Sequence, residues 1–161
     1  VVDGGATEVG IESTIVGVSD GRLLLLRPGS ITRAALEAAA GVPVALADGS
    51  DAATPASPGR LAAHYAPATP VRLDAADVRP GEALLAFGAP DLPGAAAARA
   101  ILDLSPTRDL TEAAANLYAY LRKLDRLGAA AIAVSPIPHT GLGEAIMDRL
   151  HRAAAASTFC E

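Results

Sequence analysis

The sequence predicts an α/β protein whose C-terminal part folds as a mostly parallel sheet covered by helices. From residue 71 onward, short apolar runs that suit buried strands alternate with longer helical segments, which is the pattern of such a sheet. Before residue 48 the chain reads as strands and one short helix, and a run of Ala, Asp, Gly, Ser, Thr and Pro follows. We therefore expect a β-rich unit over residues 1–47, a linker over 48–70 and a Rossmann-like domain over 71–161.

Composition limits the classes of function. The chain has 161 residues, of which 51% are hydrophobic, so it can bury a sizeable core. The formal net charge of −5 argues against a broad electrostatic surface for nucleic acid. A single cysteine, Cys160, excludes an internal disulfide and suits a reducing compartment. The sequence contains neither a membrane span nor a signal peptide, so no membrane contact is expected and the cytoplasm is the expected location.

A β-hairpin is expected near the start of the N-terminal unit. Residues 10–18 form a β-branched-rich strand candidate, residues 19–22 a turn, and residues 23–26 a second strand. Arg27 follows where the second strand stops, because Pro28 has no N–H to continue the ladder. A guanidinium at that position can point into a cleft and suits phosphate or carboxylate, although a solvated strand-end arginine is the commoner case.

Ser13 and Thr14 are polar residues inside the first strand candidate. Their hydroxyls need partners, which either a small polar ligand or the neighbouring backbone could supply. The unit continues with a short helix over residues 33–40, for which Thr32 is the expected N-cap, and with a strand over residues 42–46.

The linker contains an adjacent ring pair, His64 and Tyr65, bracketed by Pro58 and Pro67. Proline fixes φ and restrains the residue before it, so the pair is expected in a stiffened, extended segment. Such a segment can be laid across a pocket at low entropic cost. The alternative is a proline-rich linker whose rings pack on a neighbour.

The C-terminal domain contains the best helix of the sequence, over residues 109–127. Its apolar residues recur at three- and four-residue spacing and form one stripe, made of Leu110, Ala114, Leu117, Leu121 and Leu124. A second amphipathic helix is expected over residues 144–156. The expected strands are the short apolar runs at residues 71–73, 82–87, 100–104 and 130–135.

A loop over residues 135–143 joins the last expected strand to the last helix. Ligands usually bind at the carboxyl ends of strands in open α/β sheets, and Gly141 and Gly143 could hold an anion before the helix N-terminus. The spacing is not that of a dinucleotide fingerprint, so a structural loop is favoured over a nucleotide site. His139 has no nearby Cys or carboxylate cluster, so a metal site is not expected.

Four groups of motifs occur in a specific order along the chain. They are Asp-Gly-Gly at 3–5 with Gly-Ile-Glu-Ser-Thr-Ile-Val at 10–16, Leu-Arg-Pro-Gly at 26–29, Ser-Pro-Gly at 57–59 with His-Tyr-Ala-Pro at 64–67, and a C-terminal group. The C-terminal group comprises Asn-Leu-Tyr at 116–118, Pro-Ile-Pro at 136–138, Gly-Leu-Gly at 141–143 and Ala-Ile-Met-Asp-Arg-Leu at 145–150. Together they resemble the threonylcarbamoyl-AMP synthase family in its two-domain form. The resemblance implies that residues 1–47 end an YrdC-like catalytic domain and that residues 71–161 form a Sua-type domain.

The resemblance further implies a nucleotidyltransferase that makes threonylcarbamoyl-AMP and pyrophosphate from L-threonine, bicarbonate and ATP. The product would feed the transfer machinery that makes threonylcarbamoyladenosine in tRNA. Ser13 would contact threonine, Arg27 and Tyr65 would bind ATP, and His64 would lie beside Tyr65 in a lid. Mg²⁺ is expected with ATP, whereas neither a tightly bound cofactor nor a metal held by the protein is expected. The catalytic residues remain unassigned.

The family's main substrate-binding half would lie before Val1, so the chain alone is expected to be inactive. Two other interpretations of the C-terminal domain stay open. It could be a non-catalytic accessory module that binds a nucleotide, tRNA or a protein partner, or it could only brace the lid. Binding of tRNA would need an arginine face, for which the candidates are Arg122, Arg126, Arg149 and Arg152.

Overall fold

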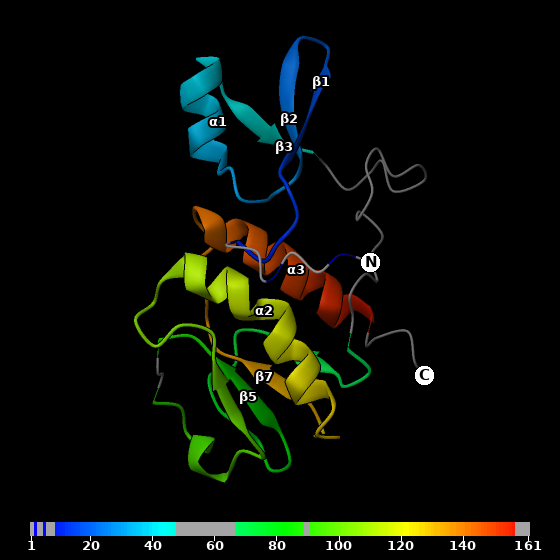
Figure 1. The fold of residues 1–161 in the computed structure, drawn as a ribbon, viewed down its shortest axis with the longest axis vertical. Coiled ribbons are helices and arrows are strands. Elements are labelled where there is room, and N and C mark those ends of the chain that lie inside the picture. The colour runs from blue at the N-terminus through cyan, green and yellow to red at the C-terminus, as the bar shows by residue number, and fades with distance from the viewer. Residues whose placement is uncertain (1, 3–4, 6–8, 48–66, 89–90, 157–161) are drawn as a thin grey trace.

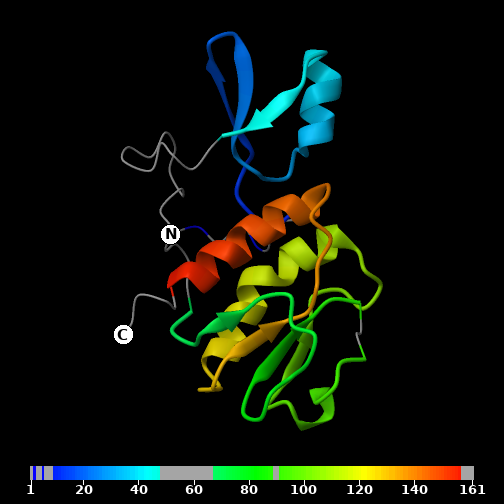
Figure 2. The same ribbon diagram turned by 180° about the vertical axis from the view of Figure 1, so that it is seen from behind.

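A computed structural model describes residues 2, 5, 9–47, 67–88 and 91–156. These residues form two sheets, and two long helices lie between them (Figure 1). The same arrangement is seen from behind in Figure 2, where the N-terminal sheet stands on the far side of the helices from the C-terminal sheet. Most of the expected linker, including His64 and Tyr65, lies outside the described residues.

The N-terminal sheet has three strands in the order β1-β2-β3. The first two form the predicted antiparallel hairpin, and the third runs parallel to β2 after a helical connection. Asp20 and Gly21 form the hairpin turn with φ of 50° and 71°, the two positive values that a tight turn between twisted strands needs. The elements are β1 (Ile15–Ser19), β2 (Arg22–Arg27), α1 (Arg33–Ala40) and β3 (Val44–Leu46).

The first strand is shorter than the sequence predicts, because residues 10–14 do not belong to the hairpin. Gly10 has a left-handed φ of 65°, and a Cβ there would lie 2.6 Å from the Cα of Ala115 in the C-terminal part. Ile11 packs against the C-terminal core. The β-branched composition of residues 10–14 indicates a strand. The packing of Gly10 and Ile11 against the C-terminal part of the chain determines the conformation instead.

The C-terminal sheet has four strands in the order β4-β7-β5-β6, and all its pairs are parallel, as predicted. The helical connection from β6 to β7 crosses over β5, which lies between these two strands and pairs with both. The elements are β4 (Val71–Arg72), β5 (Ala83–Ala86), η2 (Ala95–Ala97), β6 (Ile101–Asp103), α2 (Leu110–Asp125), β7 (Ile132–Val134) and α3 (Leu142–Ala156).

The two faces of this sheet are covered differently. Helices α2 and α3 cover one face, where the apolar stripe of α2 joins β5 and β7 in the main core. Asp109 caps α2 by accepting bonds from the N–H groups of Thr111 and Glu112. A smaller cluster fills the other face, under the connections on either side of β5. Of the helices in the described ranges, none combines the length and the apolar character that crossing a membrane demands.

Candidate functional site

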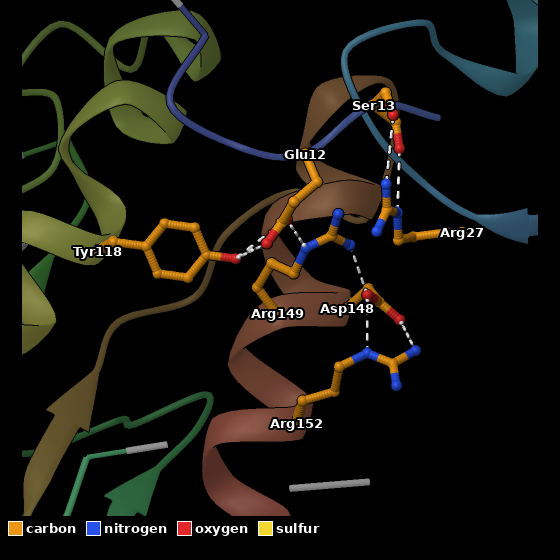
Figure 3. A network of polar contacts seen from close by, with 7 residues as sticks. All are labelled: Glu12, Ser13, Arg27, Tyr118, Asp148, Arg149 and Arg152. Atoms are coloured by element: carbon orange, nitrogen blue, oxygen red, sulfur yellow. Dashed lines mark hydrogen bonds and ion pairs between the residues drawn. The ribbon is translucent and has the colours of Figure 1, made fainter. Parts of the chain in front are cut away.

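Ser13 and Arg27, both singled out in the sequence, lie in contact at the end of the N-terminal hairpin. Arg27 ends β2, and its Nε donates to the backbone oxygen of Ser13 at 3.0 Å. Its Nη2 donates to the Ser13 hydroxyl oxygen at 3.2 Å (Figure 3). Ser13 is exposed and Arg27 is partly buried. A hydroxyl and a guanidinium are therefore held side by side next to solvent, a combination that can bind a small polar molecule together with an anion.

The backbone around Ser13 is fixed by a close approach of two loops. The Thr14 hydroxyl donates to the Ile31 carbonyl at 2.7 Å and accepts from the Ile31 N–H at 3.0 Å. Gly29 is buried against residues 12–14. A Cβ at Gly29 would clash with the backbone nitrogen of Thr14 and would lie 2.6 Å from the backbone carbonyl oxygen of Glu12. The sequence left either a ligand or the neighbouring backbone as the partner of the Thr14 hydroxyl, and in the structure the partner is the backbone of Ile31.

Glu12, which the sequence did not single out, links this loop to both C-terminal helices. Tyr118 of α2 donates to the two Glu12 carboxylate oxygens at 3.2 Å each, and Arg149 of α3 donates from Nε at 2.8 Å. The chain of contacts continues through Asp148, which accepts from Arg149 Nη1 at 2.6 Å and from Arg152 at 2.8 and 3.0 Å (Figure 3). Two carboxylates and two guanidiniums thus form one network between the N-terminal loop and α3.

Burial and charge fix the protonation states in this network. Burial raises the pKa of Glu12, but the hydrogen bond and charge of Arg149, a backbone hydrogen bond and the hydrogen bond from Tyr118 together outweigh it, so the pKa lies below its ordinary value. Burial and, next, the negative charge of Glu12 raise the pKa of Tyr118. At neutral pH the network therefore contains a carboxylate at Glu12 and a protonated phenol at Tyr118.

A cavity of about 400 Å³ lies between the N-terminal unit and α3. The ion pair of Arg33 with Glu144, 3.8 Å apart, spans the two parts. The ring centroids of His139 and His151 are 6.5 Å apart, and the ring planes are tilted at 49°. Among the residues that the structure describes, no group of three or more His, Cys, Asp or Glu side chains could hold a metal ion. The lining residues are Pro28, Arg33, Leu46, His139, Glu144, Met147, Asp148 and His151.

The loop over residues 135–143 borders a second cavity, of about 550 Å³, at the carboxyl ends of β5 and β7. Its lining is mainly apolar, and the Ser135 hydroxyl accepts from the Phe87 N–H at 2.8 Å. Gly143 packs so closely that a Cβ would clash with the Pro138 carbonyl, whereas Gly141 has a φ of 60°. Gly143 therefore has a steric reason and Gly141 a conformational reason to be glycine, which agrees with the favoured interpretation of a structural loop.

The four candidate arginines do not form one exposed face. Arg122 and Arg126 are exposed on α2 and after it, but Arg149 is 5% exposed and its charge is directed at Glu12 and Asp148. Arg152 pairs with Asp148. This distribution gives no support to a tRNA surface built from these residues.

Comparisons with known proteins agree with the motif order. A family model described as "Threonylcarbamoyl-AMP synthase, C-terminal domain" matches residues 31–155. Among curated proteins, the threonylcarbamoyl-AMP synthase of Bacillus subtilis is 33% identical, and that of Pyrococcus abyssi is 30% identical. Each alignment covers 96% of this chain and 48% of the relative.

Solved structures show the same relationship in three dimensions. The crystal structure of P. abyssi Sua5 complexed with L-threonine superposes with a TM-score of 0.75 at 25% identity, over 96% of this chain and 49% of that one. A variant of that protein in which a neighbouring His and Tyr are replaced by Ala gives a TM-score of 0.64 at 25% identity, over 95% of this chain and 45% of that one. The chain thus spans about half the length of these relatives, and it belongs to the threonylcarbamoyl-AMP synthase family.

Proposed function

We propose that this chain acts within an L-threonylcarbamoyladenylate synthase, which converts L-threonine, bicarbonate and ATP to threonylcarbamoyl-AMP and pyrophosphate for tRNA modification. Family membership and the names of the relatives support this proposal. Because the chain spans about half of those relatives, the remaining part of the catalytic site would come from a region outside the match.

The observation that carries the proposal is the pairing of Ser13 with Arg27 next to solvent. In the proposed reaction, the threonine amine and bicarbonate give a carbamate and water. A carbamate oxygen then bonds to the α-phosphorus of ATP as the bond to pyrophosphate breaks. Ser13 would bind the threonine, and Arg27 would bind phosphate oxygens and stabilise the charge of the leaving group. Mg²⁺ would arrive with the ATP phosphates.

His64 and Tyr65 complete the proposal as a lid. The relative whose variant structure was solved carries a neighbouring His and Tyr, and this sequence has one such pair. A closed lid would exclude water from the labile carbamate and from the mixed anhydride of the product. Replacing both residues with alanine should lower productive turnover and leave threonine binding intact.

The test uses the complete product of the reading frame that contains this chain. We expect pyrophosphate release that depends on L-threonine, bicarbonate, ATP and Mg²⁺ together, and no turnover from residues 1–161 alone. Ser13→Ala should raise the KM for threonine. Arg27→Ala should raise the KM for ATP and, because it also removes two hydrogen bonds to Ser13, the KM for threonine to a smaller extent. If the complete product releases no pyrophosphate under these conditions, the proposed function is wrong.

A further inference from the structure

Ser13 lies at a junction between the two parts of the protein. On its C-terminal side, Thr14 is bonded to the backbone of Ile31 in the N-terminal unit. On its other side, Gly10 lies directly against the α2 backbone, and Glu12 is held by side chains of α2 and α3. The position of the Ser13 hydroxyl therefore depends on contacts made by both units, and the nearest C-terminal contact is at the residue immediately before it.

The contact at Glu12 is specific in geometry. Arg149 has only 4% of its side chain exposed and donates from two different nitrogens to two different carboxylates, at 2.8 Å to Glu12 and 2.6 Å to Asp148. Because each of these two nitrogens is bonded, the Arg149 guanidinium cannot rotate without breaking a hydrogen bond. Arg152 bonds Asp148 from the side opposite Arg149 (Figure 3). Tyr118 approaches the Glu12 carboxylate from α2, opposite Arg149. The carboxylate is thereby held from two helices.

Stability alone is a poor explanation for this arrangement. Buried ion pairs often contribute little net stability, because desolvation offsets their attraction. Within the described part of the chain, the Nη2 of Arg149 is buried with no hydrogen-bond partner, which adds a further cost. A network that is costly to bury but holds one carboxylate from two helices is suited to fixing a geometry.

We propose that Arg149 and Tyr118 are positioning residues for the substrate-binding hydroxyl of Ser13, and that they act through Glu12. The inference rests on the proposed function, in which Ser13 contacts L-threonine. It gives the C-terminal domain a defined role in that function, because two of its helices orient a residue that binds the amino-acid substrate. A shift of Ser13 would weaken threonine binding more than ATP binding, because Arg27 contacts Ser13 but is itself held in β2 by pairing with β1.

The test is a kinetic comparison in the complete gene product. Glu12→Ala and Arg149→Met should each raise the KM for L-threonine about tenfold, and Tyr118→Phe should raise it about threefold, with the KM for ATP changed less than twofold. Glu12→Gln should recover most of the affinity for threonine, because an amide oxygen can still accept from Tyr118 and Arg149. In the Glu12→Ala background, Tyr118→Phe should have no further effect, because the phenol acts through that carboxylate.

Two matched controls separate positioning from general stability. Tyr120→Phe removes a hydroxyl two residues away on the same helix, and Arg122→Met removes an exposed guanidinium of α2 that lies outside the network. Both should leave the KM for threonine within twofold. A loss of folded protein would lower the apparent kcat and leave KM unchanged, so thermal melting and KM together distinguish the two effects.

Three results would overturn the inference. The first is an unchanged KM for threonine in folded Glu12→Ala and Tyr118→Phe, and the second is an equal rise in both KM values. In these cases Ser13→Ala alone still weakens threonine binding, and the proposed function survives. The third is the absence of turnover in the unmodified protein, which removes the proposed function and the positioning role together. If Arg149→Met fails to fold, Tyr118→Phe and its double variant decide the outcome.

Discussion

Gly29→Ala tests whether the loop packing around Ser13 is as tight as the structure indicates. A Cβ at Gly29 would lie 2.6 Å from both the backbone carbonyl oxygen of Glu12 and the carbonyl carbon of Ser13. It would lie closer still to the backbone nitrogen of Thr14. Ordinary contacts begin at 3.4 Å, so the Glu12 oxygen and the Ser13 carbon would have to retreat by about 0.8 Å and the Thr14 nitrogen by more. All three opposing atoms are backbone, and no side-chain rotation relieves the clash. Overpacking of this kind costs about 2 kcal/mol.

The assay is equilibrium urea denaturation of the chain followed by circular dichroism, together with the KM for threonine in the complete gene product. Gly41→Ala is the control, because a Cβ there meets no atom within 4 Å and pays only the cost of its left-handed φ of 70°. That cost is about 1 kcal/mol and should leave the KM for threonine unchanged. A loss of less than about 0.5 kcal/mol for Gly29→Ala, with an unchanged KM, would refute the argument.

Three further predictions concern the C-terminal domain. Leu117→Ala, at a fully buried position, should lower the free energy of unfolding by about 3 kcal/mol in urea denaturation, whereas Ile101→Ala, at a side chain 50% exposed, should lower it by less than about 1 kcal/mol. The hydrogen bonds from Arg72, at 2.6 and 3.0 Å, lower the pKa of Glu82. The stability from this pair is therefore present above the ordinary value of 4.5 and lost as the pH falls through the lower folded pKa, so Glu82→Gln should flatten the pH dependence of unfolding below pH 4.5. Asp109→Ala should lower the thermal midpoint through a loss of about 1 kcal/mol, and Asp109→Asn should restore most of it, because the asparagine oxygen can still cap α2.

Local pattern was sufficient to predict most of the fold. The stripe at 110, 114, 117, 121 and 124 predicted α2 to within two residues at its C-terminal end, because an apolar face of that width has to be buried against a core. The turn at Asp20 and Gly21 and the cap at Thr32 were also local signals, and the structure contains both. The alternation of strands and helices was enough to predict a parallel sheet.

The errors and omissions depend on contacts between distant parts of the chain. Residues 10–14 have strand-like composition, but Gly10 is fixed by α2, about a hundred residues away. Glu12 gave no signal of its own, since its partners Tyr118 and Arg149 are separated from it by 106 and 137 residues. Ser13 and Arg27 were named individually, whereas their mutual contact follows only from the folded hairpin. A single sequence without such pairings cannot indicate which polar residues meet.

The bond from Tyr118 to Glu12 also provides an optical signal. The sequence has no tryptophan and three tyrosines, so absorbance near the tyrosinate band at alkaline pH reports on very few groups. The raised pKa of Tyr118 delays its ionisation as long as α2 and the loop before β1 stay in contact. Separation of the two parts would return this phenol toward the ordinary pKa of 10.0. An alkaline titration with and without substrates would therefore measure how firmly the two halves of the chain hold each other during binding.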